Sequence, residues 1–252
     1  MKNIRLTPRL FWKEALSGAG TEITITEPAL HYLAHVLRLK ENDIFRIFND
    51  TTGEYSAIIK KIEKKKMLAE LLEKIRELPH KEIQNITLYC SPIKKTHFDN
   101  IIEKATELGV SVISPILTER TVVREVNIER LKAQCIESSE QSERLTVPKV
   151  LQPIPLKKMV SNFTSNNQII LVCAETGDAV PIYKAISNKQ PRTFTEVSII
   201  TGPEGGFTSE EFEILRTIPN VLFVRLGERI LRADTAAIAA LVCWQSVCGD
   251  WQ

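Results

Sequence analysis

The chain has 252 residues, of which 43% are hydrophobic and 25% charged, and its formal net charge at pH 7 is +2. This length fits one large or two modest globular domains, and the small net charge does not by itself indicate a nucleic-acid-binding protein. The first residues lack the apolar segment of a signal peptide, and the longest apolar stretch, residues 236–244, is too short to span a bilayer. We therefore expect a cytoplasmic protein.

Residues 1–75 read as a small β-barrel or sandwich, because short runs of strand-forming residues follow one another at close spacing. Expected strands occupy residues 21–27, 43–50, 54–62 and 66–75, and one helix is expected at 27–39. Residues 1–80 hold 14 Lys and Arg against 11 Asp and Glu, and lysines of the run 60–66 supply much of the excess. Such a run is typical of a solvated hairpin edge, and RNA binding is the alternative. Residues 76–84 resemble a linker.

Beyond residue 84 the pattern changes to strands alternating with helices. Apolar runs predict strands at 86–93, 111–117, 167–175, 196–202 and 221–227, and helical patterns cover 97–110, 127–144, 179–186, 208–218 and 234–251. This alternation predicts an α/β fold with a parallel sheet.

Three loops follow consecutive predicted strands of this second part, at residues 173–177, 201–211 and 226–236. Ligands bind at the carboxyl edge of open parallel sheets, so these loops are candidate ligand contacts. In TGPEGGFTSEE, Thr208 or Ser209 is placed to cap the next helix, with Glu211 completing a capping box. The cap does not explain Gly-Pro-Glu-Gly-Gly, whose glycines allow a close approach of the backbone to a ligand.

The loop LGERILRADTA presents Arg229 and Arg232 before a helix that begins near Asp234. Paired loop arginines are also common as solvated surface residues. The GxGxxG, GxxxxGK[ST] and GxSxG motifs are absent, which argues against a classical dinucleotide or nucleoside-triphosphate site and against a hydrolase elbow. The five cysteines lack CxxC spacing, and His31 and His35 have no third ligand beside them, so we expect no disulfide framework and no metal.

GPEGGF together with LGxRILRxxTA closely resembles the RsmE family, the 16S ribosomal RNA uracil-N(3) methyltransferases of the SPOUT superfamily. The segments IEKATELGV (102–110), TERT (118–121), EQSERLTVP (140–148) and HVLRLKENDIFRIFNDTTGEY (35–55) are similar to stretches of that family, so the resemblance covers essentially the whole chain. Thr118 and Thr121 stand where the family usually has Ser. Ala233 and Asp234 stand where it usually has a bulkier residue and Glu.

The resemblance implies a PUA-like β-barrel over residues 1–75, a linker over 76–84 and a methyltransferase domain with a deep trefoil knot over 85–252. It also implies a homodimer packed through the knotted domain. The activity implied is methylation of N(3) of a uridine in 16S rRNA with S-adenosylmethionine. The alternatives are a SPOUT enzyme acting on another RNA and a non-catalytic RNA-binding dimer.

The resemblance, together with the charge pattern and the chemistry it implies, assigns residues to roles, and the glycine loop is expected to leave room for the cofactor. The arginines expected at the chemical step are Arg232 and its rival Arg120. The expected RNA contacts are Arg9, Arg38, Lys60, Lys64, Lys65, Arg124 and Arg229. The expected cofactor contacts are Leu171, Glu175, Thr201, Gly202, Pro203, Glu204, Gly205, Gly206, Leu226, Gly227, Ile230, Leu231, Arg232, Thr235 and Ala236.

Overall fold

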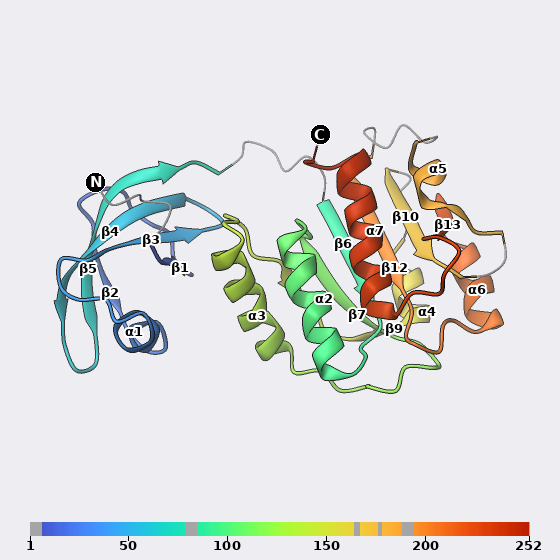
Figure 1. Ribbon diagram of the computed structural model, residues 1–252, viewed down its shortest axis with the longest axis horizontal. Coiled ribbons are helices and arrows are strands. Elements are labelled where there is room, and N and C mark those ends of the chain that lie inside the picture. The colour runs from blue at the N-terminus through green and yellow to red at the C-terminus, as the bar shows by residue number, and fades with distance from the viewer. Residues whose placement is uncertain (1–6, 79–84, 164–166, 176–177, 188–193, 252) are drawn as a thin grey trace. The chain divides into compact units, whose positions relative to one another are not determined.

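The computed structural model describes residues 7–78, 85–163, 167–175, 178–187 and 194–251 (Figure 1). The chain divides into two compact units. The N-terminal unit comprises Met1–His80 together with Ser139–Thr146, and the C-terminal unit comprises Lys81–Ser138 and Val147–Gln252. Most of the expected linker, residues 79–84, lies outside the described residues, and Arg76 belongs to the last strand of the N-terminal unit.

The N-terminal unit is built on a five-stranded sheet in the order β1-β3-β4-β5-β2, in which only the pair β1–β3 is parallel. Alternate residues of the central strands share one face, because successive side chains of a strand point to opposite sides. That face forms the core with Phe45, Ile47, Tyr55, Ala57, Ile59, Met67, Ala69 and Leu71. The strands are β1 (Arg9–Phe11), β2 (Glu22–Ile25), β3 (Ile44–Asn49), β4 (Gly53–Ile62) and β5 (Met67–Arg76). The four expected strands are confirmed, and β1 was not predicted.

The expected helix at 27–39 is shorter and differently wound. Helix α1 (Ala29–His31) continues into a π-helical turn, η2 (Tyr32–Val36), closed by a hydrogen bond from Leu37 N to Tyr32 O at 2.9 Å. A π-helical turn advances the register by one residue, so the apolar stripe of a regular helix is not kept. Leu30 and Leu33 are buried as expected, whereas Val36 is exposed.

The C-terminal unit contains one parallel sheet in the order β11-β13-β10-β12-β6-β7-β8, and β9 pairs with β7. The predicted parallel α/β fold is confirmed. Its longer strands are apolar on both faces because helices cover both. The strands are β6 (Asn85–Cys90), β7 (Val112–Leu117), β8 (Lys149–Val150), β9 (Ile154–Pro155), β10 (Gln168–Cys173), β11 (Val180–Pro181), β12 (Glu196–Thr201) and β13 (Val221–Arg225).

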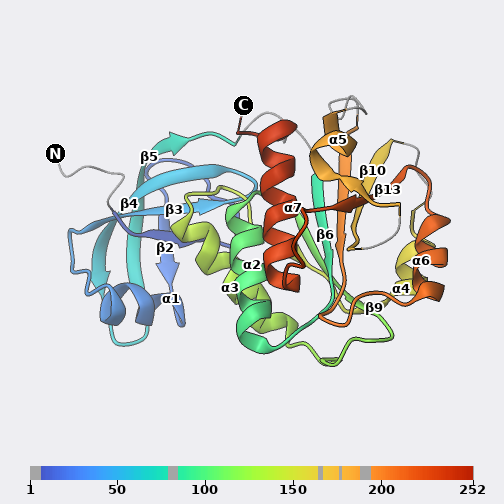
Figure 2. The ribbon, with the colours of Figure 1, turned by 45° about the vertical axis from the view of Figure 1, so that its right-hand side comes forward.

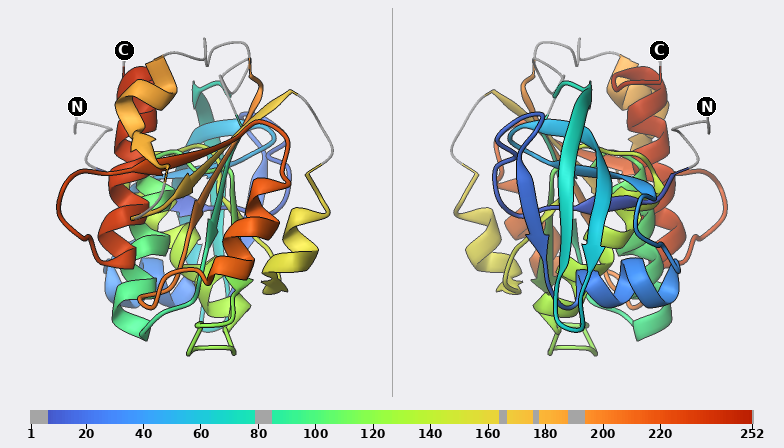
Figure 3. Two further views of the ribbon diagram at one scale, coloured as in Figure 1. Left: turned by 90° about the vertical axis from the view of Figure 1, so that its right-hand side faces the viewer. Right: turned by 90° about the vertical axis from the view of Figure 1, so that its left-hand side faces the viewer.

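The helices of the C-terminal unit form a layer on each side of the sheet (Figure 3, left). Helices α2, α5 and α7 contribute to one core cluster, and α7 lies beside α2 (Figure 2). Helices α4 and α6 contribute to a second cluster on the opposite face. The bounds are α2 (Lys95–Glu107), α3 (Ile128–Gln141), α4 (Leu156–Val160), α5 (Ile182–Ser187), α6 (Ser209–Arg216) and α7 (Ala233–Val247). Over the described residues, no helix combines the length and apolar character needed to cross a membrane.

Candidate functional site

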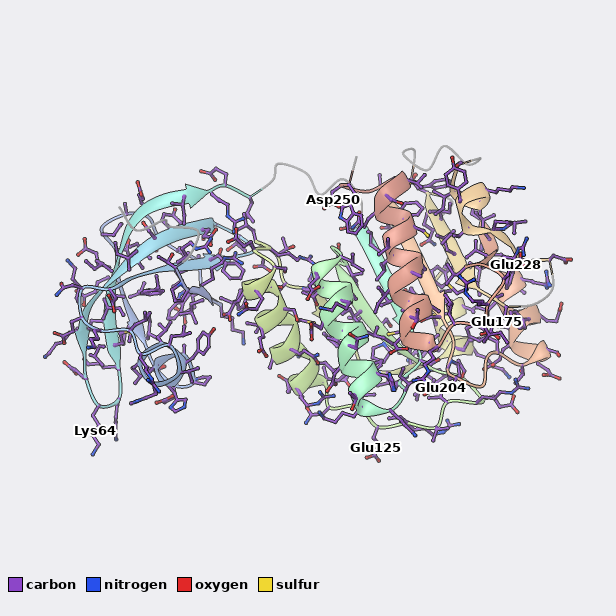
Figure 4. The ribbon with its side chains drawn as sticks, viewed as in Figure 1. Lys64, Glu125, Glu175, Glu204, Glu228 and Asp250 are labelled. Carbon is purple, nitrogen blue, oxygen red and sulfur yellow. The ribbon has the colours of Figure 1, made fainter. Side chains whose placement is uncertain are left out.

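The three predicted loops leave neighbouring strands. Strand β10 lies between β12 and β13, and all three run parallel, so the loops that follow them emerge at the same edge of the sheet. Glu175, Glu204 and Glu228 mark these three loops in Figure 4 and are exposed. Residues 176–177 of the first loop lie outside the described residues. The predicted convergence of the loops at the ligand-binding edge of a parallel sheet therefore follows from the strand order.

The glycine loop after β12 is a tight turn that leads into a capped helix. Gly206 N donates to Pro203 O at 2.9 Å, and Gly206 has φ +68°, a conformation that favours glycine. Thr208 accepts from Glu211 N through its hydroxyl, and the Glu211 carboxylate accepts from Thr208 N. The predicted capping box is confirmed. The remaining Glu211 oxygen accepts from Glu119 N at 2.9 Å, which ties the segment 118–121 to the start of α6.

Arg120 ties the same segment to the glycine loop. Its Nη1 donates to Gly205 O at 2.7 Å, and a Cβ at Gly205 would lie 3.2 Å from Arg120 Cβ. The space beside Gly205 is thus taken by Arg120 of the same chain, whereas we expected it to be left for a cofactor. Gly206 differs, because nothing lies within 4 Å of a Cβ built there. The open side of the turn is therefore at Gly206.

The segment TERT is held by its two threonines. Thr118 N donates to Thr121 Oγ1 at 2.9 Å, and the two hydroxyl oxygens are 2.8 Å apart. Both side chains are buried. The hydrogen bond from Thr118 N needs a hydroxyl at position 121, and the contact between the two side chains needs a hydroxyl at both positions. Replacement of the Ser usual in the family by Thr therefore keeps the group that the structure uses.

The third loop presents apolar and cationic side chains together. Ile230 is 81% exposed, Arg229 and Arg232 are exposed, and Leu231 is half-buried. Arg232 is the N-cap residue of α7 in an extended conformation, and its carbonyl accepts from Ala236 N at 2.8 Å. An exposed Ile beside two cations is an unusual surface, since large apolar side chains are mostly covered.

The other predicted cofactor contacts differ in accessibility. Leu171 is fully buried and belongs to the core cluster on the α2 side of the sheet, so its side chain reaches no surface. Thr201 and Pro203 are also buried. The remaining predicted positions are exposed or half-buried: Glu175, Gly202, Glu204, Gly205, Leu226, Gly227, Thr235 and Ala236.

Asp234 has a partner that the sequence did not indicate. Its Oδ2 lies 2.8 Å from Nδ1 of His97 in the first turn of α2, and its Oδ1 accepts from Thr235 N at 2.9 Å. Burial acts to raise the pKa of Asp234, but the hydrogen bonds from His97 and from Thr235 N outweigh it and hold the pKa below its usual value. The carboxylate is therefore ionised at neutral pH.

The predicted RNA contacts of the N-terminal unit separate into one buried arginine and four exposed cations. Arg9 is only 4% exposed, and its guanidinium donates to Glu54 and to three backbone carbonyls, those of Ser139, Glu140 and Arg144. It has no surface to offer a phosphate. The predicted RNA contacts of this unit that are exposed are Arg38, Lys60, Lys64 and Lys65.

Lys64 marks the tip of the hairpin between β4 and β5 and points away from the sheet (Figure 4). Lys60 forms an ion pair with Glu70 at 2.8 Å. In the C-terminal unit, Arg124 is exposed and donates to Glu119 O at 3.4 Å. Across the described part of the chain, no cluster of three or more His, Cys, Asp or Glu side chains is arranged to hold a metal ion.

Glu54 is the group that sequence reasoning missed in the N-terminal unit. It is fully buried, receives hydrogen bonds from Arg9 and Arg76, and lies 3.7 Å from Arg46. Burial is the main influence on Arg9 and lowers its pKa, and the hydrogen bond that Arg9 donates to Glu54 partly offsets this. A lone Glu in an alternating strand pattern gives no signal of such a role.

The chain combines an α/β unit, which has glycine and arginine loops at one sheet edge, with a small β unit. A family model described as RNA methyltransferase domain matches residues 79–245, and one described as RNA methyltransferase PUA domain matches residues 25–72. The chain belongs to the RNA methyltransferase family. These matches confirm the expected PUA-like domain, and the relatives described next confirm the resemblance to RsmE.

Curated and solved relatives agree with the family match. Ribosomal RNA small subunit methyltransferase E of Rickettsia conorii is 38% identical over 216 residues, which are 84% of each chain. A crystal structure of the Neisseria gonorrhoeae protein of that name, bound to S-adenosyl methionine, is 28% identical, covers 98% of this chain and 100% of its own, and has a TM-score of 0.86. A Legionella pneumophila putative methyltransferase with bound SAM is 25% identical, covers 95% and 97%, and has a TM-score of 0.78.

Proposed function

We propose that this chain methylates N(3) of a uridine in 16S ribosomal RNA with S-adenosylmethionine. The observation that carries the proposal is the convergence of the three loops after β10, β12 and β13 at one sheet edge. Support comes from the relatives of nearly equal length that carry the name of a small-subunit rRNA methyltransferase, and from the solved relative that holds S-adenosyl methionine.

The residues of the loops fit this cofactor. An adenosine needs an apolar surface beside backbone donors and acceptors. Exposed Ile230 and half-buried Leu226 and Leu231 supply the apolar surface, and the turn at Gly206 leaves backbone open to the outside. We further propose that these loops form the trefoil knot expected for the family. The proposed contacts are Glu175, Gly202, Glu204, Gly206, Leu226, Gly227, Ile230, Leu231, Thr235 and Ala236.

Bound S-adenosylmethionine supplies an electrophilic methyl group on a sulfonium. The uracil N(3) must lose its proton to accept that methyl group, and a fixed cation beside the base stabilises the negative charge that develops. Arg232 is exposed at the start of α7 and is suited to that role. Arg120 is less suited because its guanidinium is engaged with Gly205 O. An arginine cannot serve as the base at working pH, so a carboxylate, a water or the ionisation of the uracil itself must account for the N(3) proton.

The proposed RNA contacts are the exposed cations Arg38, Lys60, Lys64, Lys65, Arg124 and Arg229.

We also propose a homodimer packed through α7, whose Ile238, Ala239 and Val242 are only half-buried. An apolar helix face of this kind needs cover. Sedimentation tests the dimer directly, and a monomer at micromolar concentration contradicts it.

The deciding experiment maps the product. Small ribosomal subunits from a strain lacking the gene are incubated with the purified protein and labelled S-adenosylmethionine, and the labelled nucleoside is identified by mass spectrometry. We expect label in 3-methyluridine of 16S rRNA and in no other nucleoside. The protein carrying Arg232→Ala is run beside one carrying Arg216→Ala, which removes a partly exposed cation from α6. Label in another nucleoside, or no label in 16S rRNA, contradicts the proposal.

A further inference from the structure

We infer that His97 is a positioning residue of the proposed methyl-transfer site, which holds the Arg232 loop through the carboxylate of Asp234. The two side chains come from positions 137 residues apart, and His97 Nδ1 lies 2.8 Å from Asp234 Oδ2. His97 belongs to the first turn of the helix after β6, and Asp234 to the first turn of the helix after β13. Both helices therefore begin at the same edge of the parallel sheet.

The protonation of the pair follows from its surroundings. Asp234 is 8% exposed and ionised, so both of its oxygens act only as acceptors. His97 must then carry its proton on Nδ1 and donate it to Oδ2, while the backbone N–H of Thr235 donates to Oδ1. A carboxylate in the first turn also interacts favourably with the positive end of the helix. Both oxygens are satisfied, which fixes the orientation of the Asp234 side chain.

The fixed carboxylate sets the place where α7 begins. Arg232 caps α7, and its carbonyl accepts from Ala236 N at 2.8 Å, so Asp234 lies inside the same turn as Arg232. The residues before it, from Gly227 to Leu231, form the loop that leads from β13. Removal of the His97 donor leaves a buried carboxylate without one of its partners, which loosens this turn.

The pair is not what holds the two helices together. Helices α2 and α7 already share a core that contains Ile101, Ile102, Leu241 and Trp244. Their far ends are joined by Gln245 Nε2, which donates to Leu108 O at 2.6 Å. The His97 side chain is 38% exposed, and ion pairs of that exposure contribute little to global stability. The pair therefore acts locally, on the first turn of α7.

Two variants of His97 and one control test the inference. His97→Ala removes the donor, and His97→Asn places an amide N–H near the position of Nδ1. The control Gln245→Met breaks the tie at the opposite ends of the same helices. Amide hydrogen exchange over residues 226–236 is measured without cofactor. Cofactor affinity is measured by calorimetry, and the methyl-transfer rate constant in single-turnover reactions.

We expect His97→Ala to speed exchange at residues 233–236 and to lower the rate constant by about tenfold to a hundredfold, as a small misplacement of a catalytic group does. Cofactor affinity should fall less than the rate constant, because Thr235 and Ala236 are two of ten proposed cofactor contacts, whereas the positioning of Arg232 acts on the methyl-transfer step itself. His97→Asn should restore the slow amide exchange of residues 233–236 and the methyl-transfer rate constant. Gln245→Met should lower the melting temperature and leave that exchange and that rate constant unchanged.

Unchanged exchange in His97→Ala, failure of His97→Asn to restore it, or an equal loss in Gln245→Met would overturn the inference. Because the inference rests on the proposed function, the two failures must be distinguishable. If the unsubstituted chain methylates no RNA, the proposed function fails. The exchange experiment needs neither RNA nor cofactor and still decides whether His97 orders the Arg232 turn.

Discussion

Arg9 and Arg46 of the N-terminal unit are 4% and 5% exposed, whereas Arg229 and Arg232 of the C-terminal unit are exposed on a loop. The buried arginines contact the Glu54 carboxylate and backbone carbonyls, so their guanidinium groups are engaged inside the unit. The exposed pair stands at the carboxyl edge of the sheet, where ligands bind. The contrast teaches that arginine counts say little about RNA contact until burial is known.

Glu54→Gln tests the structural side of this contrast and should have the largest effect. The change leaves Arg9 and Arg46 buried without their carboxylate, and loss of one partner of a buried ion pair costs about 3–5 kcal/mol. Urea unfolding measures the loss. Glu70→Gln is the matched control, because its partner Lys60 is exposed and such pairs contribute about 1 kcal/mol or less. Equal losses in the two variants would erase the distinction between buried and exposed pairs.

Arg232→Ala tests the functional side. Removal of a preorganised cation from the proposed site should lower the single-turnover rate constant about a hundredfold. Cofactor affinity should change far less, and the free energy of unfolding should stay near that of the unsubstituted chain, since Arg232 is exposed. Arg216→Ala on α6 is the control for loss of a surface charge. A large loss of affinity with normal turnover would instead make Arg232 a cofactor contact and return the catalytic role to Arg120.

Gly205→Val sharpens the role of the glycine loop. The added Cβ lies 3.2 Å from Arg120 Cβ and 3.3 Å from its Cδ, so Arg120 must shift and its hydrogen bond to Gly205 O should weaken. We expect cofactor affinity to fall by about tenfold, within the range of a displaced loop. Combined with Arg120→Ala, the same change should cost less than it does alone, because the contacts with Arg120 Cγ and Cδ are removed and only the one with Cβ remains. Strict additivity in calorimetry would show that the valine blocks the cofactor directly, as we first expected from the sequence.

Lys64→Ala with Lys65→Ala should weaken RNA binding moderately. Both side chains are exposed at the β4–β5 hairpin. Loss of two phosphate contacts reduces the slope of log affinity against log salt by about 0.7–0.9 per contact. Arg9→Met is the informative companion, since Arg9 is buried, and it should destabilise the unit without changing that slope in the fraction that remains folded. An unchanged slope in the lysine variant would place the RNA elsewhere.

The smallest effect concerns Glu143 in acid. The hydrogen bond from Arg46 holds the pKa of Glu143 below its usual value, and burial offsets this in part. The ionised form is thus the one favoured by the fold. Its contribution is present above the ordinary Glu pKa of about 4.3 and is lost as the pH falls through the lowered value. The side chain is 43% exposed, so the difference in unfolding free energy between the unsubstituted chain and Glu143→Gln should be about 1 kcal/mol or less at pH 7 and vanish near pH 2. A difference that grows in acid contradicts the assignment.

Long apolar runs made the C-terminal sheet predictable. Strands β10 and β12 are buried on both faces and β13 is mostly half-buried. All three stand between helices with clear periodicity, so the position of each followed from local pattern. Strands β8, β9 and β11 span two residues each, which is too short for any periodic signal. The capping box was predictable as well, because all of its partners lie within four residues.

Contacts between distant residues were out of reach of the sequence. Arg9 meets Ser139 O across 130 residues, and His97 meets Asp234 across 137. No local property of Arg9 distinguishes a buried guanidinium from one that binds phosphate. The space beside Gly205 was likewise assigned to a ligand because the partner that fills it, Arg120, lies 85 residues earlier.

Segment Ser139–Thr146 belongs to the N-terminal unit, although the residues on both sides of it belong to the other unit. During synthesis the five strands of the N-terminal sheet leave the ribosome first, but the carbonyls that receive the Arg9 guanidinium leave only after β6, α2 and β7 have been made. The unit that is translated first therefore cannot be completed until strands and a helix of the other unit have been made. A gene fragment ending at residue 80 would encode the five-stranded sheet without the three backbone carbonyls that accept hydrogen bonds from Arg9. The N-terminal unit therefore cannot be obtained in full by cutting the gene between the two units.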